Sequence, residues 1–133
     1  MNPVPPRSRR VLVIEDEDTI GHVIAETLAE EGYEVRRARN GREALGILEG
    51  WLPQLILLDL MMPVMDGGIF RAAQQQLEGG VAEVPVIVLS GAREVRTRAA
   101  ELGAVAALSK PFELDQLVEA VGRWIRPPPS EAT

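Results

Sequence analysis

The sequence predicts an α/β fold, a doubly wound sheet in which parallel strands alternate with helices. Three observations lead to this prediction: aliphatic runs long enough for buried strands recur along the chain, apolar stripes at helical spacing separate them, and glycine or proline stands at most junctions. The β–α unit occurs five times with short connections, which requires right-handed crossovers and helices on both faces of the sheet. Five strands are too few to close an eight-stranded barrel, so the sheet should be open.

Continuous aliphatic runs mark the strands that we expect to be covered on both faces of the sheet. They occupy residues 11–14, 55–58 and 85–89. Residues 33–38 alternate only weakly and carry charges, which is typical of a strand at the edge of a sheet. Residues 105–108 form a shorter apolar run, and we expect them to be the last strand.

The first two helices are indicated by their apolar spacing and by their end signals. Between residues 20 and 28 an aliphatic side chain recurs every four positions, and Gly32 is expected to end this helix. Asp18 is expected to cap its N-terminus. The second helix should begin at Asn40, because Glu43 follows it at the spacing of a capping box.

Three further helices should follow the third, fourth and fifth strands. The third helix should be capped by Asp66 and broken by the glycine pair after residue 78, and the fourth should span residues 93–102. An apolar stripe at residues 114–125 indicates the last helix. In this helix Trp124 is expected to pack against the fold rather than to anchor an interface.

The length and composition indicate a single domain. The chain has 133 residues, of which 46% are hydrophobic, and this is enough for one core. We expect a flexible lead-in at residues 1–9, one domain at residues 10–126 and a flexible proline-rich tail at residues 127–133. No run approaches the ~18 apolar residues of a membrane helix, and no signal peptide is recognisable, so a cytoplasmic protein without membrane contact is expected.

Composition also excludes several kinds of chemistry. The chain has no cysteine, which excludes disulfides, thiolate catalysis and cysteine-based zinc sites. His22 is the only histidine, so one chain cannot build a multi-histidine metal site. The net charge of −6 argues against direct binding of nucleic acid or of an anionic membrane, and it suits solubility.

Polar side chains with complementary chemistry follow four of the five expected strands. Glu15 and Asp16 follow the first strand, Asp59 the third, Ser90 the fourth and Lys110 the fifth. The carboxyl ends of parallel strands lie at one edge of the sheet, where open α/β sheets bind their ligands. Each of these residues alone has an ordinary role in a helix cap or a turn. Their occurrence in order, each at the end of its own strand, favours a shared site instead.

The chemistry of such a site would centre on a metal ion and a phosphoryl group. Close carboxylates repel one another unless a cation joins them or one of them takes up a proton. An all-oxygen donor set favours Mg²⁺ or Mn²⁺ over zinc, and such a metal can bridge the carboxylates and a phosphoryl oxygen. Lys110 would balance a second phosphoryl oxygen, and Ser90 would hydrogen-bond a third. Asp59 could then be the nucleophile and form an aspartyl-phosphate.

Four segments carry a resemblance to a known family. They read VLVIED at residues 11–16, LLDLMMPVMDG at residues 57–67, VIVLSGA at residues 86–92 and SKPF at residues 109–112. In this order and spacing they closely resemble the receiver domain of two-component response regulators, over about residues 10–126. The resemblance implies a flavodoxin-like (βα)5 fold with strand order 2-1-3-4-5 and a role in a signalling phosphorelay.

The resemblance further implies a role for each residue at the strand ends. Asp59 would be the phosphoacceptor, and the donor would be the phosphohistidine of a sensor histidine kinase or of a histidine phosphotransfer protein. Mg²⁺ would be held by Asp16, Asp59 and the backbone carbonyl of Met61, with Glu15 acting through water. The side chains that would bind the phosphoryl oxygens are those of Ser90 and Lys110.

The same resemblance implies how the domain would signal. It would catalyse only its own phosphorylation and dephosphorylation. It would otherwise act by protein contact through the face formed by the fourth helix (residues 93–102), the fifth strand (residues 105–108) and the last helix (residues 114–125). It would be a monomer or a phosphorylation-dependent dimer, either a stand-alone regulator or part of a larger one. The Lys110–Pro111 peptide bond should be cis. Ala107 stands where many family members carry an aromatic residue that reports phosphorylation.

Two other functions remain open from the sequence. The first is a phosphatase or phosphotransferase that forms an aspartyl-phosphate. Such enzymes usually carry a second acid two residues after the nucleophile, where this chain has Met61. The second is a receiver-like domain that works as a constitutive scaffold. Its usual mark is a missing acid or lysine at the strand ends, and none is missing here.

Overall fold

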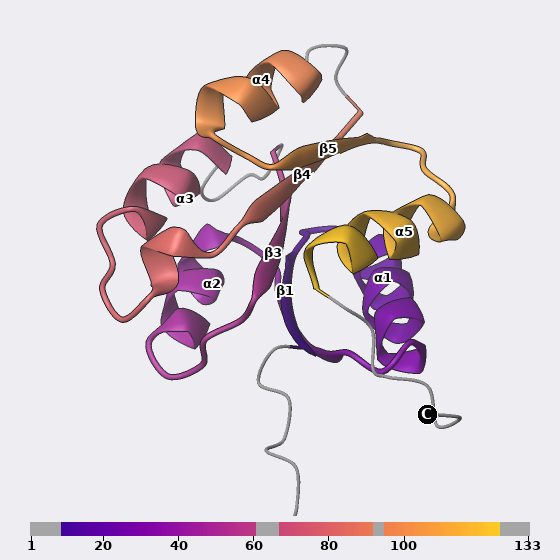
Figure 1. Ribbon diagram of the computed structural model, residues 1–133, viewed down its shortest axis with the longest axis horizontal. Helices are drawn as coiled ribbons and strands as arrows, with labels where there is room; N and C mark the ends of the chain where they lie inside the picture. The colour runs from indigo at the N-terminus through magenta and orange to yellow at the C-terminus, as the bar shows by residue number, and fades with distance from the viewer. Residues whose placement is uncertain (1–8, 61–66, 92–94, 126–133) are drawn as a thin grey trace, which may run out of the picture.

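The computed structural model describes residues 9–60, 67–91 and 95–125, and within them five parallel strands form one sheet (Figure 1). The strands lie in the order β2-β1-β3-β4-β5, which confirms the predicted doubly wound, flavodoxin-like topology. They are β1 (Arg10–Ile14), β2 (Glu34–Ala38), β3 (Leu55–Asp59), β4 (Val86–Ser90) and β5 (Ala106–Ser109). The expected lead-in and tail lie almost entirely outside the described residues, as do Met61 and Asp66.

Helices cover both faces of the sheet. They are α1 (Asp18–Glu30), α2 (Gly41–Leu48), α3 (Gly67–Gln74), α4 (Val95–Leu102) and α5 (Leu114–Trp124), with a 3₁₀ turn, η2 (Val81–Glu83), before β4. α1 and α5 lie side by side on one face, while α2, α3 and α4 pack on the other (Figure 1). Of the helices that the structure describes, none combines the length and the apolar character needed to span a membrane.

The central strand β3 shows why the sheet needs a helical layer on each side. All five of its residues are buried. Leu55 and Leu57 pack with the layer of α1 and α5, whereas Ile56 and Leu58 pack with the layer of α2, α3 and α4, because successive side chains point to opposite faces. Burying each of these side chains stabilises the fold by about 1.5–3 kcal/mol. The strand therefore holds its last residue, Asp59, at a rigid edge of the sheet.

The charged strand β2 lies at the edge of the sheet, as its sequence predicted. At this edge the ring of Trp51 is buried and two guanidinium groups lie over it, with Arg10 at 5.3 Å and Arg36 at 4.9 Å from the ring centre. The indole nitrogen of Trp51 donates to Glu34 Oε2 at 3.3 Å. Charges along an edge strand disfavour pairing with another chain, so this arrangement also protects the sheet edge.

The N-terminus of α2 is capped as predicted, with one difference. Asn40 Oδ1 accepts a hydrogen bond from the backbone N–H of Glu43 at 2.9 Å. The carboxylate of Glu43 does not return to the N–H of Asn40 but accepts from the N–H of Arg39 at 2.8 Å. The glutamate therefore fixes the end of β2 to the start of α2, one residue earlier than a standard capping box does.

The cap predicted for α1 is wrong. Asp18 is the first residue of the helix, and the N-cap position belongs to Glu17, whose side chain makes no capping hydrogen bond. The carboxylate of Asp18 forms ion pairs with Arg37 and Arg39 instead. Two cations of the neighbouring strand segment thus compete successfully with the backbone N–H groups for this carboxylate.

α3 ends earlier than the sequence predicted. Its last residue is Gln74, five residues before the glycine pair that begins at Gly79. The buried side chain of Gln74 donates to the carbonyl oxygens of Val81 at 2.9 Å and Val84 at 3.1 Å. These bonds fold the segment after the helix back toward β4, and they satisfy carbonyl groups that water cannot reach.

The expectation that Trp124 packs into the fold is also wrong, since the residue is 47% exposed. The buried stripe of α5 runs through Leu117 and Val121 and continues to Ile125. Tyr33 supports this stripe by donating its hydroxyl to the carbonyl of Ile125 at 3.0 Å. One position away from this stripe, Trp124 turns to the open side of the helix.

A side chain of α3 caps the C-terminus of α4. Arg71 donates from Nε to the carbonyl of Leu102 at 2.9 Å and from Nη2 to that of Gly103 at 3.4 Å, and its Nη1 donates to Gln74 Oε1 at 2.7 Å. A cation at the last carbonyl groups of a helix is favourable because those groups carry partial negative charge. Arg71 therefore joins α3 to α4.

Replacing Arg71 with alanine should lower the free energy of unfolding by about 2 kcal/mol, because the last carbonyl groups of α4 lose a charged donor. Urea unfolding followed by circular dichroism measures this change. Arg96 is an exposed arginine of α4 and provides the control, since its replacement by alanine should alter stability by no more than about 0.5 kcal/mol. Equal effects of the two substitutions would contradict the capping role.

Candidate functional site

The carboxyl ends of β1, β3 and β5 surround an open pocket of about 370 Å³. It is lined by Glu15, Asp16, Glu17, Asp59, Gly91 and Lys110. The parallel register places these strand ends at the same edge of the sheet, so four of the predicted site residues are brought together. Glu17 and Gly91 were not predicted, because an acid in a loop and a glycine in a turn are too common to stand out.

Three carboxylates of the pocket approach one another closely. Glu15, Asp16 and Asp59 each place one oxygen within 4.8 Å of the others. Glu15 is 1% exposed and Asp59 4% exposed, whereas Asp16 is exposed to solvent. Oxygen donors that are partly open to water suit Mg²⁺, which keeps several of its water ligands in proteins. The donor set therefore fits the metal that the sequence predicted.

Lys110 supplies the positive charge of the site. Its Nζ donates to Glu15 Oε1 at 2.7 Å and lies 3.6 Å from Asp59 Oδ2. Burial by itself would lower the pKa of Lys110, but the hydrogen bond to Glu15 and the charges of Asp59 and Glu15 outweigh it, so the pKa lies above its ordinary value. The lysine is therefore charged at neutral pH. Its peptide bond to Pro111 is cis, as the resemblance implied.

The remaining predicted residues differ in how the structure places them. Ser90 is buried at the end of β4, at the same edge as the pocket, and its carbonyl accepts from the N–H of Lys110 at 2.9 Å. Its role toward a phosphoryl group stays a prediction. The backbone carbonyl of Met61 lies outside the described residues. Ala107 is partly buried against the layer of α2, α3 and α4 and pairs in register with Val88.

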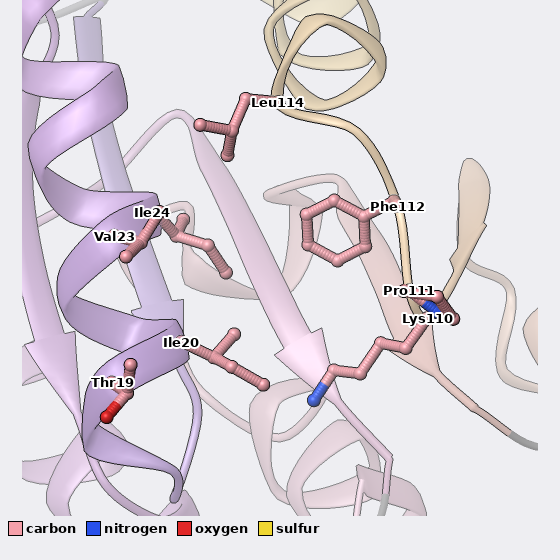
Figure 2. A pocket seen from close by; sticks show the side chains of 8 residues that line it. All are labelled: Thr19, Ile20, Val23, Ile24, Lys110, Pro111, Phe112 and Leu114. Carbon is pink, nitrogen blue, oxygen red and sulfur yellow. The ribbon is translucent and has the colours of Figure 1, made fainter.

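An apolar groove of about 390 Å³ lies beside Lys110, between α1 and the start of α5 (Figure 2). It is lined by Thr19, Ile20, Val23, Ile24, Lys110, Pro111, Phe112 and Leu114. The sequence does not indicate this groove, because Val23 fits the apolar stripe by which α1 packs on the sheet. Val23 is 38% exposed and Leu114 42% exposed. An apolar surface therefore adjoins the acidic pocket.

The geometry agrees with a comparison against known protein families. The model of the response regulator receiver domain matches residues 11–122, with the acidic pocket and Lys110 inside the matched range. The chain belongs to this family. Receiver domains are signalling domains of two-component systems, so this assignment confirms the family resemblance of the sequence.

Relatives of this receiver domain are regulatory proteins. The chain is 40% identical to the transcriptional regulatory protein PdtaR of Mycobacterium tuberculosis strain H37Rv over 114 residues, which are 85% of this chain and 55% of PdtaR. It is 29% identical to sporulation initiation phosphotransferase F of Bacillus subtilis, over 89% of this chain and 94% of that protein. The chain spans about half the length of several curated relatives that it matches, PdtaR among them.

Solved structures share the fold of this receiver domain. The response regulator TrrA of Thermotoga maritima, in complex with Mg²⁺ and BeF, has a TM-score of 0.77 and 30% identity, covering 88% of this chain and 99% of that one. The receiver domain of a sensor histidine kinase from Pseudomonas aeruginosa PAO1 has a magnesium ion in its active-site cleft. Its TM-score is 0.78 and its identity 28%, over 87% of this chain and 96% of that one.

Replacing Lys110 with methionine should lower the free energy of unfolding by about 3 kcal/mol at neutral pH without added metal, because two buried carboxylates lose their cation. The folded-state pKa of Lys110 is raised above the ordinary 10.5, so the stabilisation is complete below that value and is lost as pH rises through the higher folded-state pKa. Urea unfolding of both proteins at neutral and alkaline pH measures the difference. A difference that stays constant up to the most alkaline pH would contradict this role.

Proposed function

We propose that this receiver domain accepts a phosphoryl group on Asp59 from the phosphohistidine of a sensor histidine kinase or of a histidine phosphotransfer protein. The observation that carries the proposal is the position of Asp59. It is a buried carboxylate at the end of β3, 3.6 Å from Lys110 Nζ and within a cluster of three carboxylates. This position combines a fixed nucleophile, a fixed cation and oxygen ligands for a metal ion.

Mg²⁺ would be held by Asp16 and Asp59, with the carbonyl of Met61 as a third ligand and Glu15 acting through water; Mn²⁺ has the same preference for oxygen ligands. When bound, the metal ion neutralises the charge of a phosphoryl oxygen and of the carboxylates around it. The open side of the pocket, at the exposed Asp16, leaves room for water ligands.

The transfer itself exchanges one bond for another. An oxygen of Asp59 attacks the phosphorus atom while the bond from phosphorus to the histidine nitrogen breaks, and the imidazole leaves with the electron pair. Lys110 lies within reach of both Asp59 and Glu15, so its ammonium group can turn toward a phosphoryl oxygen as charge builds up there. Ser90, at the end of β4, would hydrogen-bond another of these oxygens.

Two comparisons support a phosphoryl-transfer role of this kind. TrrA carries Mg²⁺ and BeF, and the Pseudomonas receiver domain carries Mg²⁺ in its cleft, on the same fold as this chain. Sporulation initiation phosphotransferase F is named for phosphoryl transfer and is matched over 94% of its length. We propose that the domain catalyses only its own phosphorylation and dephosphorylation, because Met61 stands two residues after Asp59, where enzymes that form an aspartyl-phosphate usually carry a second acid.

The apolar groove beside Lys110 supports a protein donor. A phosphohistidine must reach Asp59 from solvent, and the protein that carries it must cover the surface around the pocket. The exposed side chains of Val23 and Leu114 offer apolar contact on the α1 and α5 side (Figure 2). We propose that the donor protein docks on this groove and presents its histidine above Asp59.

The signal would leave the domain by protein contact, through α4, β5 and α5. With Ala107 on β5, no aromatic ring reports the phosphorylated state at that position. We propose that the domain acts in the cytoplasm as a monomer or as a phosphorylation-dependent dimer, and that it binds neither nucleic acid nor membrane directly. Its net charge of −6 is consistent with this.

Incubation with acetyl phosphate and Mg²⁺ should add one phosphoryl group to the wild-type protein, measured by intact mass. The Asp59→Asn variant should stay unmodified, because an amide cannot form the acyl phosphate. Beryllofluoride with Mg²⁺ should likewise slow amide exchange around the pocket in the wild type alone. An unmodified wild type, or the same phosphoryl adduct on Asp59→Asn, would refute the proposal. A wild type that forms the adduct but shows no change in amide exchange would favour a constitutive scaffold.

A further inference from the structure

We propose that Arg37 of β2 is a positioning residue for the metal site, and that Gly21 of α1 makes room for it. This inference rests on the proposed function of the acidic pocket. Arg37 does not touch the pocket. It holds Asp18, the first residue of α1, and thereby fixes the loop at residues 15–17 that supplies two of the three clustered carboxylates.

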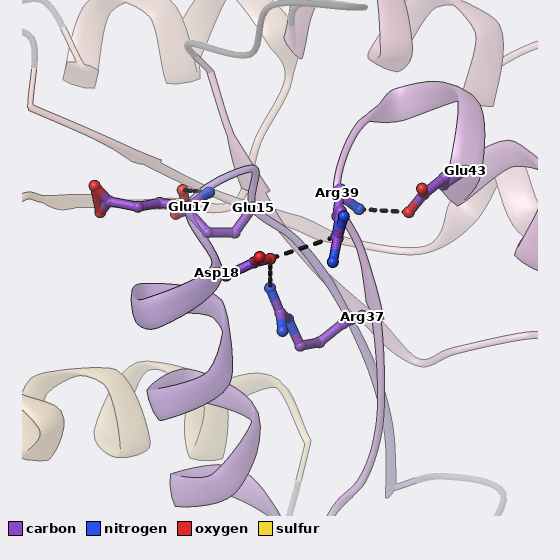
Figure 3. Close-up of polar contacts among 6 residues, drawn as sticks. All are labelled: Glu15, Glu17, Asp18, Arg37, Arg39 and Glu43. Atoms are coloured by element: carbon purple, nitrogen blue, oxygen red, sulfur yellow. Dashed lines mark hydrogen bonds and ion pairs between the residues drawn. The ribbon is translucent and has the colours of Figure 1, made fainter.

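Two arginines from the β2 segment hold Asp18 at the start of α1 (Figure 3). Arg37 Nη2 lies 3.3 Å and Arg39 Nε 3.4 Å from Asp18 Oδ1. Arg37 pairs in register with Val13 of β1, so its side chain starts from the same face of the sheet and runs along α1. The ion pair therefore ties the beginning of the helix to the neighbouring strand.

The absence of a side chain at Gly21 is what allows Arg37 to reach Asp18. A Cβ atom at this position would lie 2.7 Å from Cζ and from Nε of Arg37, which is too close for any real contact. The Nε–H group of Arg37 is buried there without a hydrogen-bond partner among the described residues. A buried unpaired donor is unfavourable, so holding the guanidinium group at this place has a cost that the ion pair must offset.

Hydrogen bonds connect the first turn of α1, which begins at Asp18, to the metal site. The N–H of Gly21 donates to the carbonyl of Glu17 at 2.9 Å, and the N–H of Glu17 donates to Glu15 Oε2 at 3.3 Å. The other oxygen of Glu15 accepts from Lys110 Nζ at 2.7 Å. The first turn of α1 and the loop before it thus form one connected unit. The N–H of Glu15 attaches the start of this unit to the carbonyl of Ala38 in β2 at 3.0 Å, and Asp18 attaches its helical end.

An electrostatic role and a positioning role of Arg37 predict opposite effects of its removal on Mg²⁺ binding. If the guanidinium group acts mainly through its charge, its removal should strengthen Mg²⁺ binding, because a cation near the pocket repels another. If it positions the loop, its removal should weaken Mg²⁺ binding, as loss of contacts behind metal ligands generally does. Replacing Gly21 with alanine separates the two, because it displaces the guanidinium group without changing any charge.

The test is titration of the metal-free protein with MgCl₂ by isothermal titration calorimetry. The dissociation constant for Mg²⁺ should rise about tenfold in Gly21→Ala and in Arg37→Ala, with no further rise in the double variant because both act on one contact. Gly46→Ala is the matched control, since a Cβ at this position in α2 meets no atom within 4 Å, and its Mg²⁺ affinity should equal that of the wild type.

A second measurement separates positioning from a general loss of structure. Alanine favours helix over glycine, so Gly21→Ala should keep the melting temperature of the wild type while its Mg²⁺ affinity falls. The NMR signal of the Arg37 Nε–H group should exchange slowly with water in the wild type and rapidly in Gly21→Ala, because displacement exposes it.

The outcomes that would overturn the inference are distinct from those that bear on the proposed function. Unchanged Mg²⁺ affinity in Gly21→Ala and Arg37→Ala, or tighter binding in Arg37→Ala, would overturn the positioning role while Asp59 could still be phosphorylated. A fall in melting temperature that matches the fall in affinity would also overturn it. A wild type that binds no Mg²⁺ and forms no adduct with acetyl phosphate would refute the proposed function, and the inference with it.

Discussion

The functional edge of this fold depends on the balance between one lysine and two buried carboxylates. Glu15 and Asp59 are almost fully buried, and buried carboxylates are tolerated only when they are paired. Lys110 pairs with both, although β4 separates its strand from β3. Two strand spacings amount to about 10 Å, a distance that the long lysine side chain and the carboxylate side chain that meets it span together. The last strand therefore makes the acidic ends of β1 and β3 possible.

Most of this edge could be predicted from the sequence, because buried parallel strands leave a clear pattern. The aliphatic run that ends at Asp59 and the one that precedes Glu15 need cover on both faces, so a doubly wound sheet follows, and with it one shared edge for the strand ends. The pairing of Lys110 with Glu15, 95 residues apart, follows from topology rather than from local sequence. The strand order itself came from the family motifs, since periodicity does not specify which strands are neighbours.

Predictions from neighbouring residues in the sequence failed where a side chain makes its contacts with a distant part of the chain. Asp18 has the type and place of a helix cap, but two arginines from another element hold its carboxylate. α3 ends at Gln74, before the glycines, because the amide of Gln74 meets carbonyl groups that follow later in the chain. Val23 fits the apolar stripe of α1 but borders an open groove. Single-sequence patterns do not contain these long-range contacts.

The contact between Arg37 and Gly21 is one long-range contact that the sequence does indicate. A glycine inside a helix lowers helix stability by about 1 kcal/mol relative to alanine, and α1 carries one at Gly21. The buried, unpaired Nε–H group of Arg37 adds a second local cost at the same place. Two unfavourable features thus meet at one contact, in the first turns of α1 that follow Glu15 and Asp16, as is expected where position matters more than stability. These departures from local propensity mark the contact on which the proposed positioning of Glu15 and Asp16 depends.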